Sequence, residues 1–333
     1  MKLGARHFQH LENSIEDGLR DARAVALMGP YSYGLLPNSP LQMMNAQGQA
    51  PQSVRVVLHA CRAILPGGYR VEILPNNIEE REIPVEAPYV EFIPTPGERY
   101  HLFLSVSEHE RIPAGIMESR PIRRPHLVPD CHLECVTDEK RKAFGGTAPN
   151  RMKIGEWQDG KVLQSYVPAT LCLHGNATLM QWFQYFEKEL EKVATICQKV
   201  ILENRLMDLG KQHFAMQVLM HIRSRQGQFK WQLPSSSPVH MVAYMGDLCG
   251  VVQGVLQSGD RDFVRNQLQN GKIHDLEPIL QRFLAAGEIP HEEILQWFRM
   301  SKKMLESLLL TFNSLLTKST PKPKSGDRNI ASG

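Results

Sequence analysis

The sequence of 333 residues has little net charge and few long apolar runs. Lys and Arg number 38 against 35 Asp and Glu, and a formal charge of +3 does not by itself imply a polyanionic partner. No apolar run approaches the ~20 residues that span a bilayer, and residues 1–10 lack the apolar core of a secretory signal. With 42% hydrophobic and 22% charged residues, the composition is that of a soluble globular protein. We therefore expect a cytoplasmic protein of two domains.

The sequence also lacks the short motifs of common enzyme chemistry. The P-loop pattern, the dinucleotide-binding GxGxxG pattern and the GxSxG nucleophile elbow do not occur. The six cysteines are scattered over both halves rather than densely spaced, which predicts free thiols in a reducing compartment. We therefore expect no catalytic residues and no cofactor, so the protein is predicted not to be an enzyme.

One cluster of thiols and imidazoles is a candidate zinc site, since zinc prefers these ligands. Its members are Cys131, His132 and Cys135, with Cys172 and His174 as further ligands. However, a single Cys-x₃-Cys pair in an alternating strand is typical of thiols that pack as small hydrophobes. We therefore predict no metal site, and a zinc-dependent enzyme is kept only as an alternative. The run His291-Glu292-Glu293 lacks a second histidine and is interpreted as an acidic first helical turn.

Proline is scarce in the second half of the chain. Sixteen of the 22 prolines lie between Pro30 and Pro168, which indicates short strands and loops in the first half. Alternating apolar residues predict a hairpin from Val54–Ala60 and Tyr69–Ile73, joined by Pro66-Gly67-Gly68. Further strands are predicted at Leu102–Val106, Cys131–Val136 and Val162–Val167, and a helix at Phe8–Leu27. An antiparallel β-sandwich or open barrel fits this pattern best.

The second half has a seven-residue apolar repeat instead. After the predicted N-cap Asn176, the seam alternates spacings of four and three residues, which is typical of helices that pack against one another. Its members are Leu179, Phe183, Phe186, Leu190, Val193, Cys197 and Val200. The same register places Asn204 on the seam, where a polar residue can fix the register or the oligomeric state.

Further helices follow the first seam. Ser237 and Pro238 begin a second one, and Pro290 precedes a third that runs from Ile294 to Leu315. Shorter helices are predicted at Lys211–Arg225 and Ile273–Ala286. Three glycines spaced four apart in the second seam, Gly246, Gly250 and Gly254, predict a close approach by another helix.

The predicted fold class is therefore α+β, with an antiparallel β domain followed by an α-helical bundle. The domain boundaries predicted are 1–174 for the β-rich domain with its leading helix, 175–318 for the helical bundle, and 319–333 for a polar tail. The tail is rich in Lys, Pro and Ser and has nothing to bury, so it is predicted to be disordered.

Several short segments follow one another in a distinctive order: His7-Phe8-Gln9, Gly29–Leu35, Ile64–Gly68, Asn150–Ile154 and Ser165–Ala169. Their order and spacing resemble a known family, TssK, the baseplate subunit of type VI secretion systems. The chain departs from the family pattern at Gly67, where Asp is common, and at Ala169, where a second Pro is common. A turn and a strand exit tolerate both changes.

The resemblance implies a structural adaptor of a contractile injection system, a homotrimer whose β-rich domain is shell-like and related to phage receptor-binding proteins. That domain would bind the wedge proteins TssF and TssG, in a baseplate assembled at the inner membrane. The interface residues it implies are His7, Phe8, Gln9, Tyr31, Tyr33 and Pro66; the competing interpretation is that these aromatics close the domain core. Family members usually continue into a C-terminal head that docks on the membrane complex, so we expect a shortened form that anchors its baseplate differently.

A nucleic-acid-binding adaptor is a second hypothesis. Arg120, Arg123, Arg124 and His126 are interleaved with prolines and could contact phosphates. No aromatic residue for base stacking lies among them, so a solvated loop is the preferred interpretation and no nucleic acid is expected as a partner.

Overall fold

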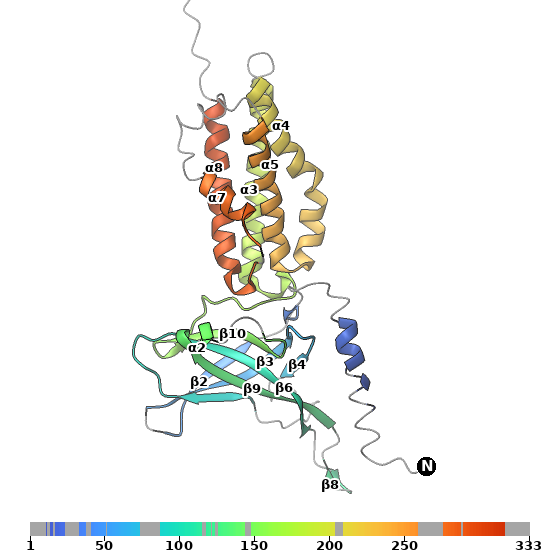
Figure 1. The fold of residues 1–333 in the computed structure, drawn as a ribbon, viewed down its shortest axis with the longest axis vertical. Helices are drawn as coiled ribbons and strands as arrows, with labels where there is room; N and C mark the ends of the chain where they lie inside the picture. The colour runs from blue at the N-terminus through green and yellow to red at the C-terminus, as the bar shows by residue number, and fades with distance from the viewer. Residues whose placement is uncertain are drawn as a thin grey trace, which may run out of the picture. The chain divides into compact units, whose positions relative to one another are not determined.

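The computed structural model describes residues 11, 14–15, 17–23, 33–37, 41–50, 52–73, 87–114, 118–120, 122–123, 126–143, 148–203, 209–258, 276–287 and 289–316. These residues form an α+β fold in which antiparallel strands precede long helices (Figure 1). Two compact units are present. One contains Met1–Phe186, Gly227–Tyr244 and Gly287–Arg299, and the other contains Glu187–Gln226, Met245–Ala286 and Met300–Gly333. Of the predicted N-terminal helix, residues 11, 14–15 and 17–23 are described, and they are helical.

One sheet is organised around a single long strand. Its strands are β1 (Gly34–Leu35), β2 (Gln42–Gln47), β3 (Val54–Ile64), β4 (Arg70–Ile73) and β5 (Tyr89–Phe92). The central β3 pairs antiparallel with each of the other four. The turn from β3 to β4 closes where the Leu65 N–H donates to the Tyr69 carbonyl at 2.8 Å, and Gly68 there has a φ of +80°, which glycine adopts readily. The predicted hairpin forms between β3 and β4, but residues 61–64 of β3 make the pairing, whereas the predicted residues 54–60 pair with β2 and β5.

A four-stranded antiparallel sheet has the order β11-β10-β6-β9. Its strands are β6 (Tyr100–Ala114), β9 (His126–Thr137), β10 (Arg151–Gln158) and β11 (Lys161–Val162), and a separate small pair is formed by β7 (Glu118–Ser119) and β8 (Ile122–Arg123). The short helix α2 (Asp138–Ala143) follows β9. The strands predicted at Leu102–Val106 and Cys131–Val136 are confirmed. The strand predicted at Val162–Val167 is wrong beyond Val162, because the chain turns there and the Tyr166 N–H reaches the Leu163 carbonyl.

The two larger sheets share one apolar core. Side chains from β3, such as Val56 and Leu58, belong to the same buried cluster as Leu102, Leu104 and Ile154 from the four-stranded sheet. Each such side chain contributes roughly 1.5–3 kcal/mol when it is fully buried. Because side chains alternate along a strand, the other face of β6 carries His101, Phe103 and Ser105, which are also buried. This second face of β6 is therefore shielded from solvent as well, although two of its three side chains are polar.

Long helices make up the second half of the chain. They are α3 (Ala177–Glu203), α4 (Leu209–Ser224), α5 (Pro238–Ser258), α7 (Leu276–Leu284) and α8 (Ile294–Leu316), with short turns η1 (Leu173–Gly175), η2 (Gln228–Gln232), η3 (Leu233–Ser235) and η5 (His291–Glu293). The predicted N-cap is confirmed, since the Asn176 side-chain oxygen accepts hydrogen bonds from the N–H groups of Thr178 at 2.8 Å and Leu179 at 3.4 Å.

The apolar seam residues of α3 are buried. Leu179, Phe183, Phe186, Leu190 and Val193 are each at most 6% exposed, whereas Asn204 lies outside the described residues. In the first unit the Phe186 ring meets that of Phe298 edge-on at 5.5 Å. In the second unit, Phe214 and Phe312 have ring centroids 4.9 Å apart. The helices are thus held mainly by aliphatic and aromatic contacts.

Helix α5 carries the three glycines at which the sequence predicts a close approach by another helix. A Cβ at Gly246 or Gly250 would lie at ordinary contact distance from Phe283 or Leu284, so α7 packs there, whereas at Gly254 a Cβ would meet nothing within 4 Å. Residues 238–257 of this helix are long and apolar enough, by length and composition alone, to cross a membrane. Half of that stretch is buried in the protein, and core helices of this length pass the same test.

Candidate functional site

Four of the segments that carry the family resemblance meet in the β-rich part of the structure. The Leu35 N–H donates to the Ala169 carbonyl at 2.8 Å, and the Leu171 N–H donates back to the Leu35 carbonyl at 3.0 Å. A Cβ at Gly34 would lie 2.5 Å from the backbone of Ala169, so only glycine allows this approach. The segment Gly29–Leu35, in its described part, is thus bound directly to Ser165–Ala169. We call the region where these segments meet, with the residues that line the cavity between them, the junction.

The other two segments join the junction through a tight turn. The Gly67 N–H donates to the Pro149 carbonyl at 2.6 Å, next to the segment Asn150–Ile154. A Cβ at Gly67 would lie 2.8 Å from that same carbonyl oxygen, which explains why this chain has a glycine there. Pro66, one of the residues predicted at the wedge interface, lies half-buried in this turn.

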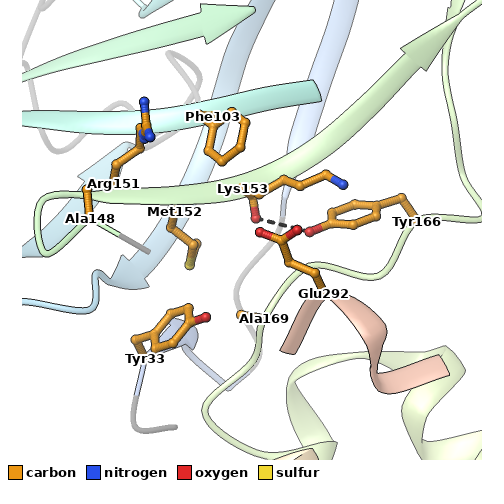
Figure 2. Close-up of a pocket in the computed structure, with 9 residues that line it drawn as sticks. All are labelled: Tyr33, Phe103, Ala148, Arg151, Met152, Lys153, Tyr166, Ala169 and Glu292. Carbon is orange, nitrogen blue, oxygen red and sulfur yellow. Dashed lines mark hydrogen bonds between the residues drawn. The ribbon is translucent and has the colours of Figure 1, made fainter. Parts of the chain in front are cut away.

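A small cavity lies at the centre of the junction (Figure 2). Tyr33, Lys153, Tyr166 and Glu292 are among the residues that line it, and they come from four separate stretches of the chain. The volume is about 20 Å³, which is enough for one water molecule but not for a substrate. The cavity therefore marks a packing junction rather than a small-molecule site.

Lys153 is the most deeply buried charged side chain of the junction. Its side chain is 3% exposed, and its ammonium lies 2.7 Å from the Glu156 carboxylate. The same ammonium lies 4.4 Å from the centre of the Tyr166 ring, whose hydroxyl donates to the Lys153 carbonyl at 3.4 Å. Burial lowers the pKa of Lys153, and the hydrogen bond to Glu156 acts against that shift. The lysine is thus held between a carboxylate and an aromatic face.

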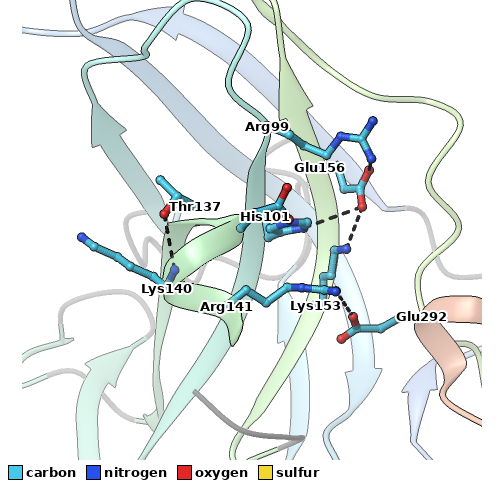
Figure 3. Close-up of polar contacts among 9 residues, drawn as sticks. Arg99, His101, Thr137, Lys140, Arg141, Lys153, Glu156 and Glu292 are labelled. Carbon is cyan, nitrogen blue, oxygen red and sulfur yellow. Dashed lines mark hydrogen bonds and ion pairs between the residues drawn. The ribbon is translucent and has the colours of Figure 1, made fainter. Parts of the chain in front are cut away.

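His101 bridges two carboxylates on the outer face of the sheet, those of Asp138 and Glu156. Figure 3 shows the side towards Glu156. Its Nε2 lies 2.5 Å from the Asp138 Oδ1, and its Nδ1 lies 3.7 Å from the Glu156 Oε1. Burial lowers the pKa of His101, the hydrogen bond to Asp138 acts against that shift, and the positive charges of Lys153 and Arg141 lower the pKa further. The hydrogen bond to His101 in turn lowers the pKa of Asp138. The imidazole is therefore neutral near pH 7 and donates from Nε2 to Asp138.

The first turn before α8 contacts this same face. The Arg141 guanidinium of α2 lies 2.6 Å from the Glu292 carboxylate. The neighbouring His291 is 2% exposed and packs edge-on against the Tyr33 ring at 4.8 Å. The residues interpreted as an acidic first helical turn therefore form the 3₁₀ turn η5 ahead of α8, and Glu292 bonds to an arginine of the β-rich part.

Two of the six residues predicted at the wedge interface lie in or beside the junction. Tyr33 and Pro66 are both half-buried, and the Tyr33 ring contacts His291. The other four, His7, Phe8, Gln9 and Tyr31, lie outside the described residues.

The candidate zinc ligands do not converge. Cys131 and Cys135 share one face of β9 and pack against the apolar core, whereas His132 lies on the alternate face, where its Nε2 is 3.1 Å from the Ser107 hydroxyl. Within the described ranges, no group of three or more His, Cys, Asp or Glu side chains is placed to hold a metal ion. All six cysteines are described and unpaired, and burial raises the pKa of Cys131 and Cys135 to about 12.

Sequence reasoning missed most of the polar junction. Lys153 lies in the segment Asn150–Ile154, but no local pattern indicates its burial or its partner Glu156. His101 belongs to no motif, and Glu292 belongs to a run that the sequence indicates only as an acidic first helical turn. One feature of the sequence could have indicated the polar face. His101 is a titratable residue inside a predicted strand in which every second residue is apolar.

The fold of this chain is similar to that of known structures, although its sequence matches no family. No protein-family model and no curated protein matches the sequence. Among solved structures, a TssK from the type VI secretion system of EAEC, in complex with a nanobody, superposes with a TM-score of 0.53 at 14% identity, covering 92% of this chain and 100% of that chain. A crystal structure of TssK gives a TM-score of 0.51 at 15% identity, covering 95% of this chain and 67% of that one.

A chain of the TssK-TssF-TssG baseplate subcomplex gives a lower TM-score of 0.47 at 14% identity, with 95% of each chain covered. The conclusion rests on the two better superpositions, which cover more than nine-tenths of this chain. The chain therefore has the fold of TssK.

Proposed function

We propose that this protein is a structural baseplate adaptor of a type VI secretion system, a contractile injection machine. The observation that carries the proposal is the TssK fold over more than nine-tenths of the chain. A second support is independent of the superposition. Four of the short segments that resemble TssK lie far apart in the sequence, yet they meet in one junction.

The proposed architecture has a β-rich domain at 1–174, a helical bundle at 175–318 and a polar tail at 319–333. The β-rich domain would be related to phage receptor-binding proteins, as the resemblance implies. The bundle is supported by the burial of the apolar seam of α3 and of its aromatic partners. In this proposal the copies associate as a homotrimer, with Asn204 setting the helical register.

A non-enzymatic role is supported by how the polar groups of the junction are used. Lys153 is paired with Glu156, His101 with Asp138, and Arg141 with Glu292. The pairs His101–Asp138 and Arg141–Glu292 each hold one segment of the chain to another, whereas Lys153 and Glu156 pair within β10. The cavity beside Lys153 and Glu292 is too small for a substrate.

The proposed partners are the wedge proteins TssF and TssG, in the cytoplasm at a baseplate on the inner membrane. The proposed contact surface includes His7, Phe8, Gln9, Tyr31, Tyr33 and Pro66. The exposed parts of Tyr33 and Pro66 would make the contact, since both side chains are half-buried in the free chain.

Co-purification tests this function. The full chain is expressed with the TssF and TssG encoded in the same gene cluster, and the complex is analysed by size-exclusion chromatography with light scattering. We expect co-elution of the three proteins and, for the chain alone, a mass three times 37.8 kDa. A monomer at micromolar concentration that does not bind the wedge would contradict the proposal.

A further inference from the structure

One ring nitrogen of His101 forms no hydrogen bond within the described part of the chain. The Nε2 bonds to Asp138, whereas the Nδ1 is buried without a hydrogen-bond partner, and the side chain is only 3% exposed. This Nδ1 faces the Glu156 carboxylate, whose Oε1 lies 3.7 Å away (Figure 3). In a neutral imidazole that donates from Nε2, the Nδ1 is an acceptor, so two acceptors face each other. A proton on Nδ1 would turn this contact into a hydrogen bond.

The Glu156 carboxylate can serve either of two neighbours. Its Oε1 accepts a hydrogen bond from the Lys153 ammonium at 2.7 Å and is the same oxygen that faces His101. Its Oε2 lies 3.8 Å from the Arg99 guanidinium. Hydrogen bonds between charged groups are roughly twice as strong as those between neutral groups. A charged His101 would therefore compete with Lys153 for Oε1.

A second carboxylate lies beside Lys153. Lys153 and Glu292 line the same small cavity, together with Tyr166 (Figure 2). Burial lowers the pKa of Lys153, and the negative charge of Glu292 acts against that shift, so the two charges interact. The lysine side chain has a flexible four-carbon stem and three N–H donors, so it can turn from one carboxylate to another. Lys153 therefore has a second partner available when Glu156 turns to His101.

Arg141 is the cation of this network that can be released into water. Its guanidinium holds Glu292 at 2.6 Å, and its side chain is 39% exposed, whereas the side chain of Lys153 is 3% exposed. A cation at the surface is hydrated when it loses its partner, but a buried cation is not. Because Arg141 belongs to α2 and Glu292 to η5, its release would end this contact between the two elements.

The charges that face His101 come from two elements. They are Asp138 and Arg141 of α2, and Lys153 and Glu156 of β10. While the imidazole is neutral, Lys153 and Arg141 each have their own carboxylate. One more positive charge in this set repels both of these cations, and Arg141 is the one with access to water. The neutral and the charged imidazole therefore favour different sets of ion pairs.

We propose that His101 is a proton-operated switch that controls whether α2 holds the turn η5 ahead of α8. A proton from solvent binds at Nδ1, and His101 then donates a hydrogen bond to Glu156. Lys153, displaced from that carboxylate, turns to Glu292 and releases Arg141 into water. Only hydrogen bonds and ion pairs change. This inference concerns a state of the chain itself and does not depend on the proposed baseplate function.

The switch responds to acidification. Burial and the nearby positive charges lower the pKa of His101, and the hydrogen bond to Asp138 opposes this shift without cancelling it. The folded chain therefore takes up this proton only below the ordinary histidine value of about 6.5. Above that pH the imidazole is neutral, and Arg141 holds η5.

Hydrogen exchange of the full chain, followed by mass spectrometry, tests the switch. The peptide of residues 289–299 covers η5 and the start of α8, where the Glu293 N–H donates to the Pro290 carbonyl at 3.0 Å. Rates are corrected for the intrinsic dependence of amide exchange on pH. In the unmodified chain we expect this peptide to exchange about tenfold faster at about pH 5 than at about pH 7.5.

Three variants assign the effect to the proposed groups. His101→Gln cannot take up the proton, so its peptide should exchange slowly at both pH values. Arg141→Ala lacks the contact that is released, so its peptide should exchange fast at both. His240→Gln, at an exposed histidine of α5, is the matched control and should behave like the unmodified chain. Circular dichroism verifies that the variants fold, and His101→Asn replaces His101→Gln if the latter does not.

Three results would overturn the switch. If the pH effect is equal in His101→Gln and the unmodified chain, another group is the sensor. If the Arg141→Ala peptide exchanges slowly at about pH 7.5, α2 is not what holds η5. If the peptide of the unmodified chain exchanges equally fast at both pH values, no release occurs, whatever the variants do.

Discussion

The helices and the outer face of the four-stranded sheet both exclude water, but they do so with opposite chemistry. Around α3 and α8 most buried side chains are apolar, as at Phe186 and Phe298. On the outer face of the sheet, His101, Lys153 and Glu156 are buried or nearly so and form hydrogen bonds or ion pairs. Apolar burial stabilises whatever arrangement excludes water, whereas a buried charge is tolerated only beside its own partner. The helical core should therefore supply stability and the polar face should specify one geometry.

The largest effect is expected in the helical core. Phe298→Ala removes a fully buried ring that packs edge-on against Phe186, so we expect a loss of about 4 kcal/mol in unfolding free energy. Urea denaturation followed by circular dichroism measures it. Leu310→Ala, at a residue that is 57% exposed on the same helix, is the control and should cost under about 0.5 kcal/mol. Similar losses for the two variants would mean that the core is not where α8 derives its stability.

The next largest effect is expected on the polar face. Glu156→Gln leaves the Lys153 ammonium buried without its carboxylate, at a cost of about 3 kcal/mol. The double variant Lys153→Met/Glu156→Leu removes both charges and should recover most of that loss, because well-packed apolar groups can replace a buried ion pair. Denaturation of all three forms in the same buffer makes the comparison. A double variant as unstable as Glu156→Gln would show that the pair itself stabilises the fold.

A smaller effect depends on pH. Because the pKa of His101 is lowered in the folded chain, the unfolded chain takes up the proton first as pH falls below the ordinary value of 6.5. The unfolding free energy should therefore be unaffected by His101 above that pH and should decrease below it. In His101→Gln this contribution is absent, so stability should fall less between about pH 7.5 and about pH 5, a range that spans the ordinary histidine pKa. Parallel curves for the two proteins would contradict the assignment.

The smallest effect is expected at the surface of the junction. Arg141 and Glu292 are 39% and 33% exposed, so Arg141→Ala should cost no more than about 1 kcal/mol, and less in high salt. A double-mutant cycle with Glu292→Ala isolates the coupling between the two side chains. Coupling that is unchanged by salt would mean that the pair is shielded from water and belongs with the buried pairs.

The helices were more readily predicted from sequence than the polar face. An apolar seam repeats every seven residues, so Leu179 and Phe183 reveal their helix and its buried side without any tertiary information. The N-cap Asn176 and the proline at the first helical position, Pro238, are equally local signals. Strand β3 and its hairpin were visible for the same reason, because period-two alternation is a local pattern.

The polar face was not visible because nothing local marks it. Lys153 in a strand has the appearance of a solvent-facing residue until Glu156 and Tyr166 are placed around it. Glu292 is far from Arg141 in the sequence, and no periodicity links a 3₁₀ turn to α2. The strand predicted at Val162–Val167 failed for a related reason, since apolar alternation cannot reveal the turn at which the chain leaves the sheet.

Four strands pair with β3, so the folding of this sheet depends on that single strand. Strands β1, β2, β4 and β5 all depend on it, and they extend from Gly34 to Phe92. Contacts between residues so far apart form slowly, because the intervening loops must close first. In hydrogen exchange, the central amides of β3 should be the last of its sheet to exchange, since releasing them requires every neighbouring strand to separate. The stability of the whole sheet against local unfolding therefore depends on β3.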